Sequence, residues 1–366
     1  MNATFYLLLP LRRKAVIFTM TLLAFSFALR AQLLDPATQP KFMEALPNPS
    51  VINARNGGFF TIKIGETYQW LGLRKPNGKK MPTKVWGYGL FNGNVTYPGP
   101  TLLAAKNVPV DIKWDNKLPD GHMLPVDHSI HLAHLMKPGI PVVTHLHGGH
   151  TESASDGLPD AWFTQGFKET GPGWVKKNLH YDNDQEAATL WYHDHALGYT
   201  RLNVYAGLAG FYLLTDANEQ QLINNGVLPS GNYERGIVIQ DRMFMTNGDL
   251  FYPSADPMML PPSSPTPSVL PEFFGNFIVV NGMIWPKLTV EPRKYRFRFL
   301  NGSDSRFYIL RLSNGANFMQ IGTDEGLLPF PVTLNELLLG PGERADLIVD
   351  FSGASGNIVL QNFGPD

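Results

Sequence analysis

Two His-x-His sequences constrain the fold of this chain more than any other feature. His145 and His147 are separated by one residue, and His193 and His195 repeat the pattern. In a β-strand, side chains two residues apart point to the same face and lie roughly 6.6–7 Å from each other. Two such strands side by side would therefore direct four imidazoles into one space, with the intervening residues on the opposite faces.

The histidine pairs predict one half of a site for more than one metal ion. Neutral imidazoles suit copper, zinc, iron or nickel rather than calcium or magnesium. No histidine follows His195 in the 366-residue sequence, and the sequence contains no cysteine. These residues therefore cannot build a disulfide, a zinc–thiolate site, a thiol nucleophile or a Cys-ligated blue-copper centre.

Short strand-like segments with frequent turn residues fill the chain from residue 58 onward. With 35 Gly and 30 Pro, this pattern predicts an all-β chain of two antiparallel sandwiches. The expected strands are 59–64, 108–114, 206–215, 237–240, 294–300, 347–349 and 358–360. Within 294–300, aromatic residues and arginines alternate, so they should occupy opposite faces. A helix is expected at 216–224, with Asp216 as its N-cap.

The expected organisation has five parts. They are a signal peptide in residues 1–31, an N-terminal extension in 32–57, a first sandwich in 58–215, a helix and linker in 216–235, and a second sandwich in 236–366. The sequence stops shortly after the last expected strand. The second sandwich is therefore expected to be incomplete, with an exposed edge.

The N-terminal residues are typical of an export signal. Basic residues 12–14 precede an uncharged, mostly apolar run over 15–29, and Ala31 follows at a plausible cleavage point. This predicts a periplasmic, cell-surface or secreted protein without a membrane anchor after cleavage; an uncleaved anchor is the alternative. The formal net charge of −1 gives no indication of nucleic-acid binding.

The histidine pairs belong to longer patterns that resemble those of the multicopper oxidases, and more closely the branch of bacterial spore-coat laccases and bilirubin oxidases. The patterns are His145-Leu146-His147-Gly148, Ser155-Asp156-Gly157, Trp162-Phe163 and Trp191-Tyr192-His193-Asp194-His195, with support from residues 97–101, 200–208, 290–298 and 342–346. The resemblance runs from about residue 53 onward and covers the family's first two domains. It implies tandem cupredoxin-like Greek-key sandwiches, the second incomplete.

The resemblance also implies roles for single residues. His145 matches a ligand of the type 2 copper, and His147, His193 and His195 match ligands of the type 3 copper pair. Asp156 matches an acidic residue near the path of dioxygen and water, where it would steer protons. The alternative for Asp156 is a plain turn residue before a glycine.

The activity implied by the resemblance is oxidation of phenolic or similar small reductants, coupled to four-electron reduction of dioxygen to water. The family's third domain supplies the remaining cluster ligands and the type 1 copper, and it needs histidines and a cysteine that this sequence lacks. The chain alone is therefore not expected to be a competent oxidase. The alternatives are a non-catalytic copper-binding or interaction protein, or part of a split oxidase whose third domain lies on a separate chain.

Other candidates receive simpler interpretations. His150 is expected near the surface, Asp194 is expected to hydrogen-bond structure rather than metal, and methionines are expected to fill ordinary packing positions. The remaining loop histidines, expected to be solvated, are His122, His128, His131 and His134. A binuclear zinc hydrolase of the metallo-β-lactamase type is disfavoured, because the aspartate that its motif requires falls at Gly149.

Overall fold

The computed structural model describes residues 33–133, 139–256 and 261–365. The expected signal peptide and His134 lie outside these ranges. Strands dominate the described residues, and the α-helices are short: α2 spans Thr200–Ala206 and α3 spans Ala217–Asn224. Within these ranges, no helix has the length and apolar character needed to span a membrane. The all-β class expected from the sequence is confirmed.

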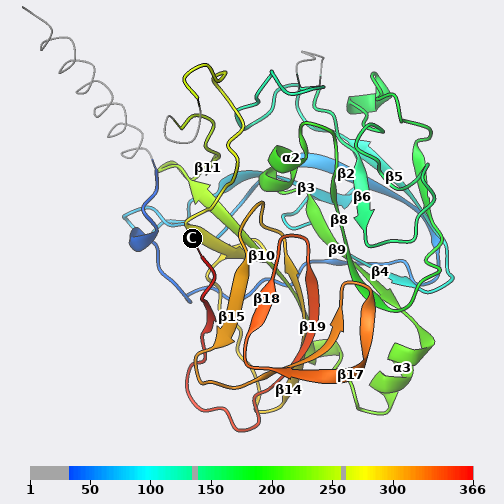
Figure 1. Ribbon diagram of the computed structural model, residues 1–366, viewed down its shortest axis with the longest axis vertical. Coiled ribbons are helices and arrows are strands. Elements are labelled where there is room, and N and C mark those ends of the chain that lie inside the picture. Colours follow the sequence, from blue (N-terminus) through cyan, green and yellow to red (C-terminus); the bar gives the residue numbers. More distant parts are fainter. Residues whose placement is uncertain (1–32, 134–138, 257–260, 366) are drawn as a thin grey trace, which may run out of the picture.

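Nine strands build the first sandwich, in the upper part of Figure 1. They are β1 Val51–Asn53, β2 Gly58–Gln69, β3 Thr83–Leu90, β4 Thr101–Ala105, β5 Val110–Asn116, β6 Thr144–His147, β7 Asn178–Tyr181, β8 Ala188–Asp194 and β9 Ala209–Thr215. One sheet has the order β1-β4-β9-β8-β6 and the other the order β3-β2-β5-β7. Buried side chains of both sheets, including Trp114 and Tyr192, form one core.

The second sandwich lies below the first in Figure 1. Its strands are β10 Glu234–Phe244, β11 Leu250–Phe251, β12 Phe277–Val280, β13 Met283–Ile284, β14 Lys294–Asn301, β15 Tyr308–Leu312, β16 Phe318–Thr323, β17 Gly326–Leu334, β18 Leu337–Leu339, β19 Arg344–Asp350 and β20 Leu360–Asn362. The larger sheet has the order β13-β12-β10-β14-β19-β16-β17, with β11 paired to β10. A smaller sheet, β18-β15-β20, shares its core.

Several details differ from the expectation of purely antiparallel sandwiches. The pairs β1·β4, β2·β5, β4·β9 and β10·β14 are parallel. In the first three, the chain enters the other sheet before it returns beside the earlier strand, whereas β11, β12 and β13 lie in the same sheet as β10 and β14. β1 comes from the expected N-terminal extension and yet is part of the first sandwich. β20, near the C-terminus, overlaps the strand expected at 358–360 only at Leu360 and pairs antiparallel with β15.

The expected helix is present, and a second short helix was missed. Asp216 is the N-cap of α3, where its Oδ1 accepts a hydrogen bond from the Glu219 amide at 2.7 Å. α2 covers residues 200–206 and overlaps the strand expected at 206–215 only at Ala206; the observed strand, β9, begins at Ala209. The seven-residue α2 has no side-chain N-cap, which explains why the usual start signal was absent.

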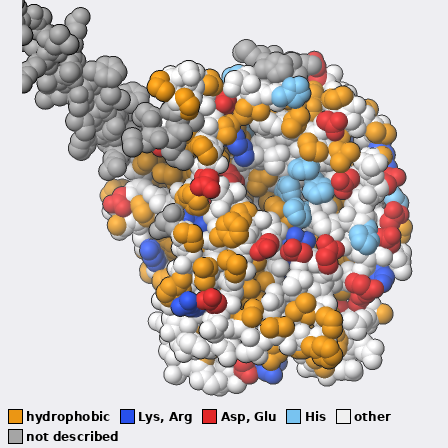
Figure 2. Space-filling model, in the orientation of Figure 1, with side chains coloured by type: hydrophobic (Ala, Val, Ile, Leu, Met, Phe, Trp, Pro, Cys, Tyr) orange, Lys and Arg blue, Asp and Glu red, His pale blue; other side chains and the backbone are white. Residues whose placement is uncertain are grey.

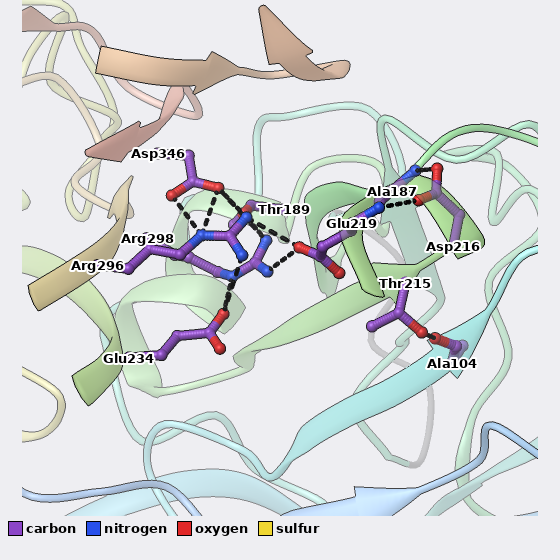
Figure 3. A network of polar contacts seen from close by, with 10 residues as sticks. All are labelled: Ala104, Ala187, Thr189, Thr215, Asp216, Glu219, Glu234, Arg296, Arg298 and Asp346. Carbon is purple, nitrogen blue, oxygen red and sulfur yellow. Dashed lines mark hydrogen bonds and ion pairs between the residues drawn. The ribbon is translucent and has the colours of Figure 1, made fainter. Parts of the chain in front are cut away.

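The alternation expected for β14 is confirmed, and both faces of the strand are buried. Its aromatic residues pack in the core of the second sandwich. Its arginines, Arg296 and Arg298, turn toward the first sandwich and form ion pairs with Glu219, Glu234 and Asp346 (Figure 3). A buried ionic network therefore lies at the junction of the two sandwiches.

Two further contacts join the sandwiches beside this network. Arg298 Nη1 donates a hydrogen bond to Thr189 Oγ1 of β8 at 3.0 Å. Trp191, also on β8, packs with Val238 and Leu300 of the second sandwich. The strand that carries part of the histidine motif is thus fixed from both sandwiches.

β17 is the outer strand of the larger sheet. Pro329 and Pro331 lie in its centre, and Phe330 between them is 79% exposed.

Candidate metal centre

β6 and β8 place the two histidine motifs beside each other. The strands are antiparallel neighbours, with His145 opposite His193 and His147 opposite Trp191. Leu146, between the first two histidines, packs in the core, so the imidazoles face away from it. His195 follows the last residue of β8 and joins the same group of rings. The shared pocket expected from the spacing is present.

The four imidazoles of His145, His147, His193 and His195, here called the four-imidazole site, are close together. Ring centroids of contacting pairs lie 4.7 to 5.7 Å apart. Figure 2 shows histidine side chains gathered in a hollow of the surface, with acidic side chains along one border. The Nδ1 atom of His147 lies 3.3 Å from Nε2 of His193. Nitrogens bound to one tetrahedral ion at about 2.0 Å are roughly 3.3 Å apart, so this pair fits a shared ion.

The four-imidazole site is open rather than closed around a single ion. Within the described ranges, no three His, Asp or Glu side chains are arranged as ligands of one metal ion. Structural zinc sites, by contrast, surround one ion with four ligands. Among the described residues, the four imidazoles therefore do not form the closed, single-ion arrangement of a structural zinc site.

Backbone carbonyls fix the orientation of three of the four rings. The Nδ1 atoms donate to the carbonyl oxygens of Asp156 (from His145, 2.6 Å), Asp194 (from His193, 2.8 Å) and Gly157 (from His195, 2.9 Å). A carbonyl oxygen only accepts, so Nδ1 carries a hydrogen in each of these three rings, and Nε2 is the nitrogen left to face a metal ion. Such hydrogen bonds are the usual support of metal-binding histidines.

The environment favours the uncharged form of three of these imidazoles. Burial lowers the pKa of His193 well below its usual value and lowers that of His145. Burial, reinforced by the positive charge of Arg344, lowers the pKa of His147 to about 4. Neutral rings at physiological pH have lone pairs available for a metal ion, so the residues present fit a copper site.

Asp156 lies beside His145 in two ways. Its carbonyl oxygen accepts the hydrogen bond of His145, and its carboxylate Oδ1 lies 3.5 Å from the same Nδ1 atom. The next residue, Gly157, has a φ of +72°. Asp156 is therefore both a turn residue and an acidic group next to the four-imidazole site.

The other histidines have mixed outcomes. His150 is exposed, as expected, with its ring 3.2 Å from the Asp184 carboxylate. The expectation that His122 is solvated is wrong, because its ring packs on Trp86 and lies 3.1 Å from Asn203 Oδ1. The remaining described loop histidines, His128 and His131, are exposed.

Asp194 has the structural role expected for it. The carboxylate is buried and accepts hydrogen bonds from the amides of Val143 and Ala196 and from the side chain of Asn203. Burial raises its pKa to about 7. It faces away from the imidazoles and holds the chain just beyond β8.

The sequence did not indicate that the second sandwich contributes to this site. The turn before β19 brings Gly342 against His147, and Arg344 Nε donates to the Thr189 carbonyl at 3.0 Å. In the sequence, residues 342–346 stand out only as part of a family pattern, since nothing in their spacing predicts contact with β6 or β8.

Comparisons with known proteins agree with this geometry. A family model described as multicopper oxidase matches residues 134–219. The laccase of Bacillus subtilis (strain 168) is 45% identical over 332 residues, which is 89% of this chain and 62% of that protein. The laccase of Bacillus stratosphericus is 48% identical over 330 residues, 88% of this chain and 62% of that protein.

A solved structure shares the fold over most of the described chain. The McoA multicopper oxidase of the hyperthermophile Aquifex aeolicus superposes with a TM-score of 0.68 at 28% identity, covering 88% of this chain and 60% of that one. The chain thus spans about three-fifths of the length of the relatives that it matches. By sequence, by fold and by its histidine motifs, the chain belongs to the multicopper oxidase family.

Proposed function

We propose that this chain binds copper at the four-imidazole site and serves the oxidation of phenolic or similar small reductants, coupled to four-electron reduction of dioxygen to water. The observation that carries the proposal is the convergence of four imidazoles, and burial lowers the pKa of three of them, which favours the neutral form that binds metal. Copper bound there would supply one-electron redox chemistry and an affinity for dioxygen.

The residues would divide the work as the family pattern implies. His145 would hold a type 2 copper, and His147, His193 and His195 would hold part of a type 3 pair. The carbonyl groups behind His145, His193 and His195 orient the rings. Asp156, with its carboxylate beside His145, would accept protons from solvent and pass them toward the site.

An electron-entry copper of the type 1 kind requires a cysteine thiolate. The 366 residues of this sequence contain none, so such a centre would have to come from residues outside them, on the same chain or on a separate one. We propose that these residues alone bind copper without oxidising phenols. Residues 12–31 further support export to the periplasm, the cell surface or the medium.

Equilibrium copper titration of the metal-free protein tests the proposal. His145→Ala and His193→Ala should each weaken copper binding, whereas the exposed His150→Ala should leave it unchanged and serves as the matched control. Unchanged affinity in both His145→Ala and His193→Ala would remove the ligand assignment. Robust oxidation of a phenol by these residues alone would show that the proposed need for an outside electron-entry site is wrong.

A further inference from the structure

His147 differs from the other three members of the four-imidazole site. Among the hydrogen bonds of the described residues, His147 is the one member whose Nδ1 faces another imidazole instead of a backbone carbonyl. The conformation of its ring must therefore be set by packing. A half-turn of this ring about its Cβ–Cγ bond would turn the carbon Cδ2, instead of Nδ1, toward His193.

Two groups pack against this ring. Trp191 of β8 stacks on it, with ring centroids 5.2 Å apart and planes inclined by 30°. The turn at Gly342, from the second sandwich, lies at the edge shared by both rings. A Cβ atom on Gly342 would be 3.6 Å from His147 Cε1 and 3.8 Å from Trp191 Cζ2, which is ordinary contact distance. The ring thus sits between its own sandwich and the second one.

Arg344 holds this turn in place. Its Nη1 donates to the Gly342 carbonyl at 2.9 Å, its Nε donates to the Thr189 carbonyl at 3.0 Å, and its Nη2 donates to the Asp324 carbonyl at 3.2 Å. The side chain is 2% exposed. A planar guanidinium can satisfy three acceptors in fixed directions, which a lysine ammonium cannot reproduce.

Arg344 also touches the strand that carries His147. A Cβ atom on Gly148, the residue after His147, would lie 2.5 Å from Arg344 Nη2, so only glycine lets the guanidinium approach this closely. The same side chain therefore contacts the end of β6, the start of β8 and the turn that packs on His147.

We propose that Arg344 is a positioning residue of the four-imidazole site: through Gly342 and Thr189 it keeps the His147 ring in the orientation that turns Nδ1 toward His193. The consequence for copper rests on the proposed function, because a misplaced His147 would remove one ligand. The consequence for the ring itself holds in the metal-free protein. The second sandwich would then be part of the site.

The test is Arg344→Lys, which keeps the charge and removes the planar set of donors. In the metal-free protein labelled with 15N-histidine, long-range 1H–15N NMR spectra report the tautomer and exchange of each ring, assigned from single histidine variants. The His147 signals should shift or double while those of His145, His193 and His195 stay in place. Copper binding should weaken roughly tenfold, as for other residues that support metal ligands.

Arg311→Lys is the matched control, because Arg311 pairs with Glu336 at the surface, away from the histidines. Arg311→Lys should change neither the NMR signals of His147 nor the copper affinity. Should Arg344→Lys fail to fold, Asp324→Asn takes its place, since Asp324 Oδ1 lies 3.2 Å from Nη1 and accepts from the Arg344 amide. The same selective change, smaller in size, is expected.

Unchanged His147 signals in the folded variant, or equal changes in all four rings, would overturn the positioning role. Absence of copper binding in the wild-type protein would remove the proposed function and leave the NMR result standing. The two failures are therefore distinguishable.

Discussion

The Nη2 atom of Arg298, on β14, lies 2.6 Å from the Glu219 carboxylate on α3, and both side chains are at most 3% exposed. The same arginine bonds Glu234 and Thr189, so one side chain links four elements of the two sandwiches. Ion pairs taken this far from water are costly to form and more costly to break on one side.

We therefore expect Arg298→Met to destabilise the protein by about 3–5 kcal/mol, because three carboxylates would be left with Arg296 alone. Chemical denaturation would measure the change. Arg311→Met is the control, since its exposed ion pair with Glu336 is worth at most about 1 kcal/mol. Equal losses in the free energy of unfolding would show that the buried network stabilises the protein no more than the exposed ion pair does.

Asp156→Ala should leave the copper affinity of the four-imidazole site nearly unchanged. The group that orients His145 is the backbone carbonyl of residue 156, which the substitution keeps. The carboxylate is assigned only to proton transfer. Calorimetric titration with copper would detect a large loss of affinity, and such a loss would mean that the side chain, not the carbonyl, holds the ring.

Gly157→Ala should be strongly destabilising. Gly157 has a φ of +72°, and a Cβ atom there would lie 2.3 Å from the Thr144 carbonyl oxygen and 2.8 Å from His145 Cα. Gly315 also has a φ of +72°, and an added Cβ would meet no described atom within 4 Å. Gly315→Ala should therefore reduce the free energy of unfolding only by the roughly 1–2 kcal/mol that an L-residue loses at a positive φ.

The free energy of unfolding should thus fall further in Gly157→Ala than in Gly315→Ala, and copper binding should weaken only in the former, because its carbonyl orients His195. Urea titrations of both variants provide the comparison. Similar losses in the two would indicate that residue 157 is limited by its backbone conformation alone.

His122 should make the metal-free protein less stable in acid. Its Nδ1 accepts from the Leu124 amide at 2.9 Å and its Nε2 lies 3.1 Å from Asn203 Oδ1, a pairing that suits the neutral ring. Burial lowers its pKa to about 4. Between the unfolded value, about 6.5, and this value, the unfolded chain binds more protons, so stability falls as the pH falls.

In that interval, His122 lowers the free energy of unfolding by at most about 1.4 kcal/mol for each unit by which the pH falls. Denaturation curves between pH 4.5 and 7 should show a shallower pH dependence in His122→Gln than in the wild type. Because other buried histidines act in the same direction, the difference between the two slopes is the relevant quantity. Parallel slopes would contradict the partly buried, neutral state of His122.

The histidine pairs were predictable because strand geometry alone decides which side chains share a face. Leu146 in the core and His145 and His147 outside it follow directly from a period of two. The N-cap at Asp216 was equally visible, since it depends on a single local hydrogen bond. Features that rest on one stretch of chain were accessible from the sequence.

Features that depend on contacts between distant stretches of the chain could not be predicted from the sequence. The parallel partner of β10 is β14, about sixty residues later, and periodicity carries no information about that pairing. The sequence around His122 is that of a polar loop, and the partial burial of its ring depends on Trp86 of β3. Arg344 contacts β8 across the junction of the two sandwiches, so its role beside the four-imidazole site could not be predicted from the sequence.

The prolines of β17 disfavour pairing of this outer strand with a strand of another molecule. An outer strand with free amide hydrogens can recruit a strand from another molecule and start an intermolecular sheet. Pro329 and Pro331 supply no amide hydrogens at the centre of this strand. Phe330 can therefore remain at the surface without the strand becoming a template for aggregation.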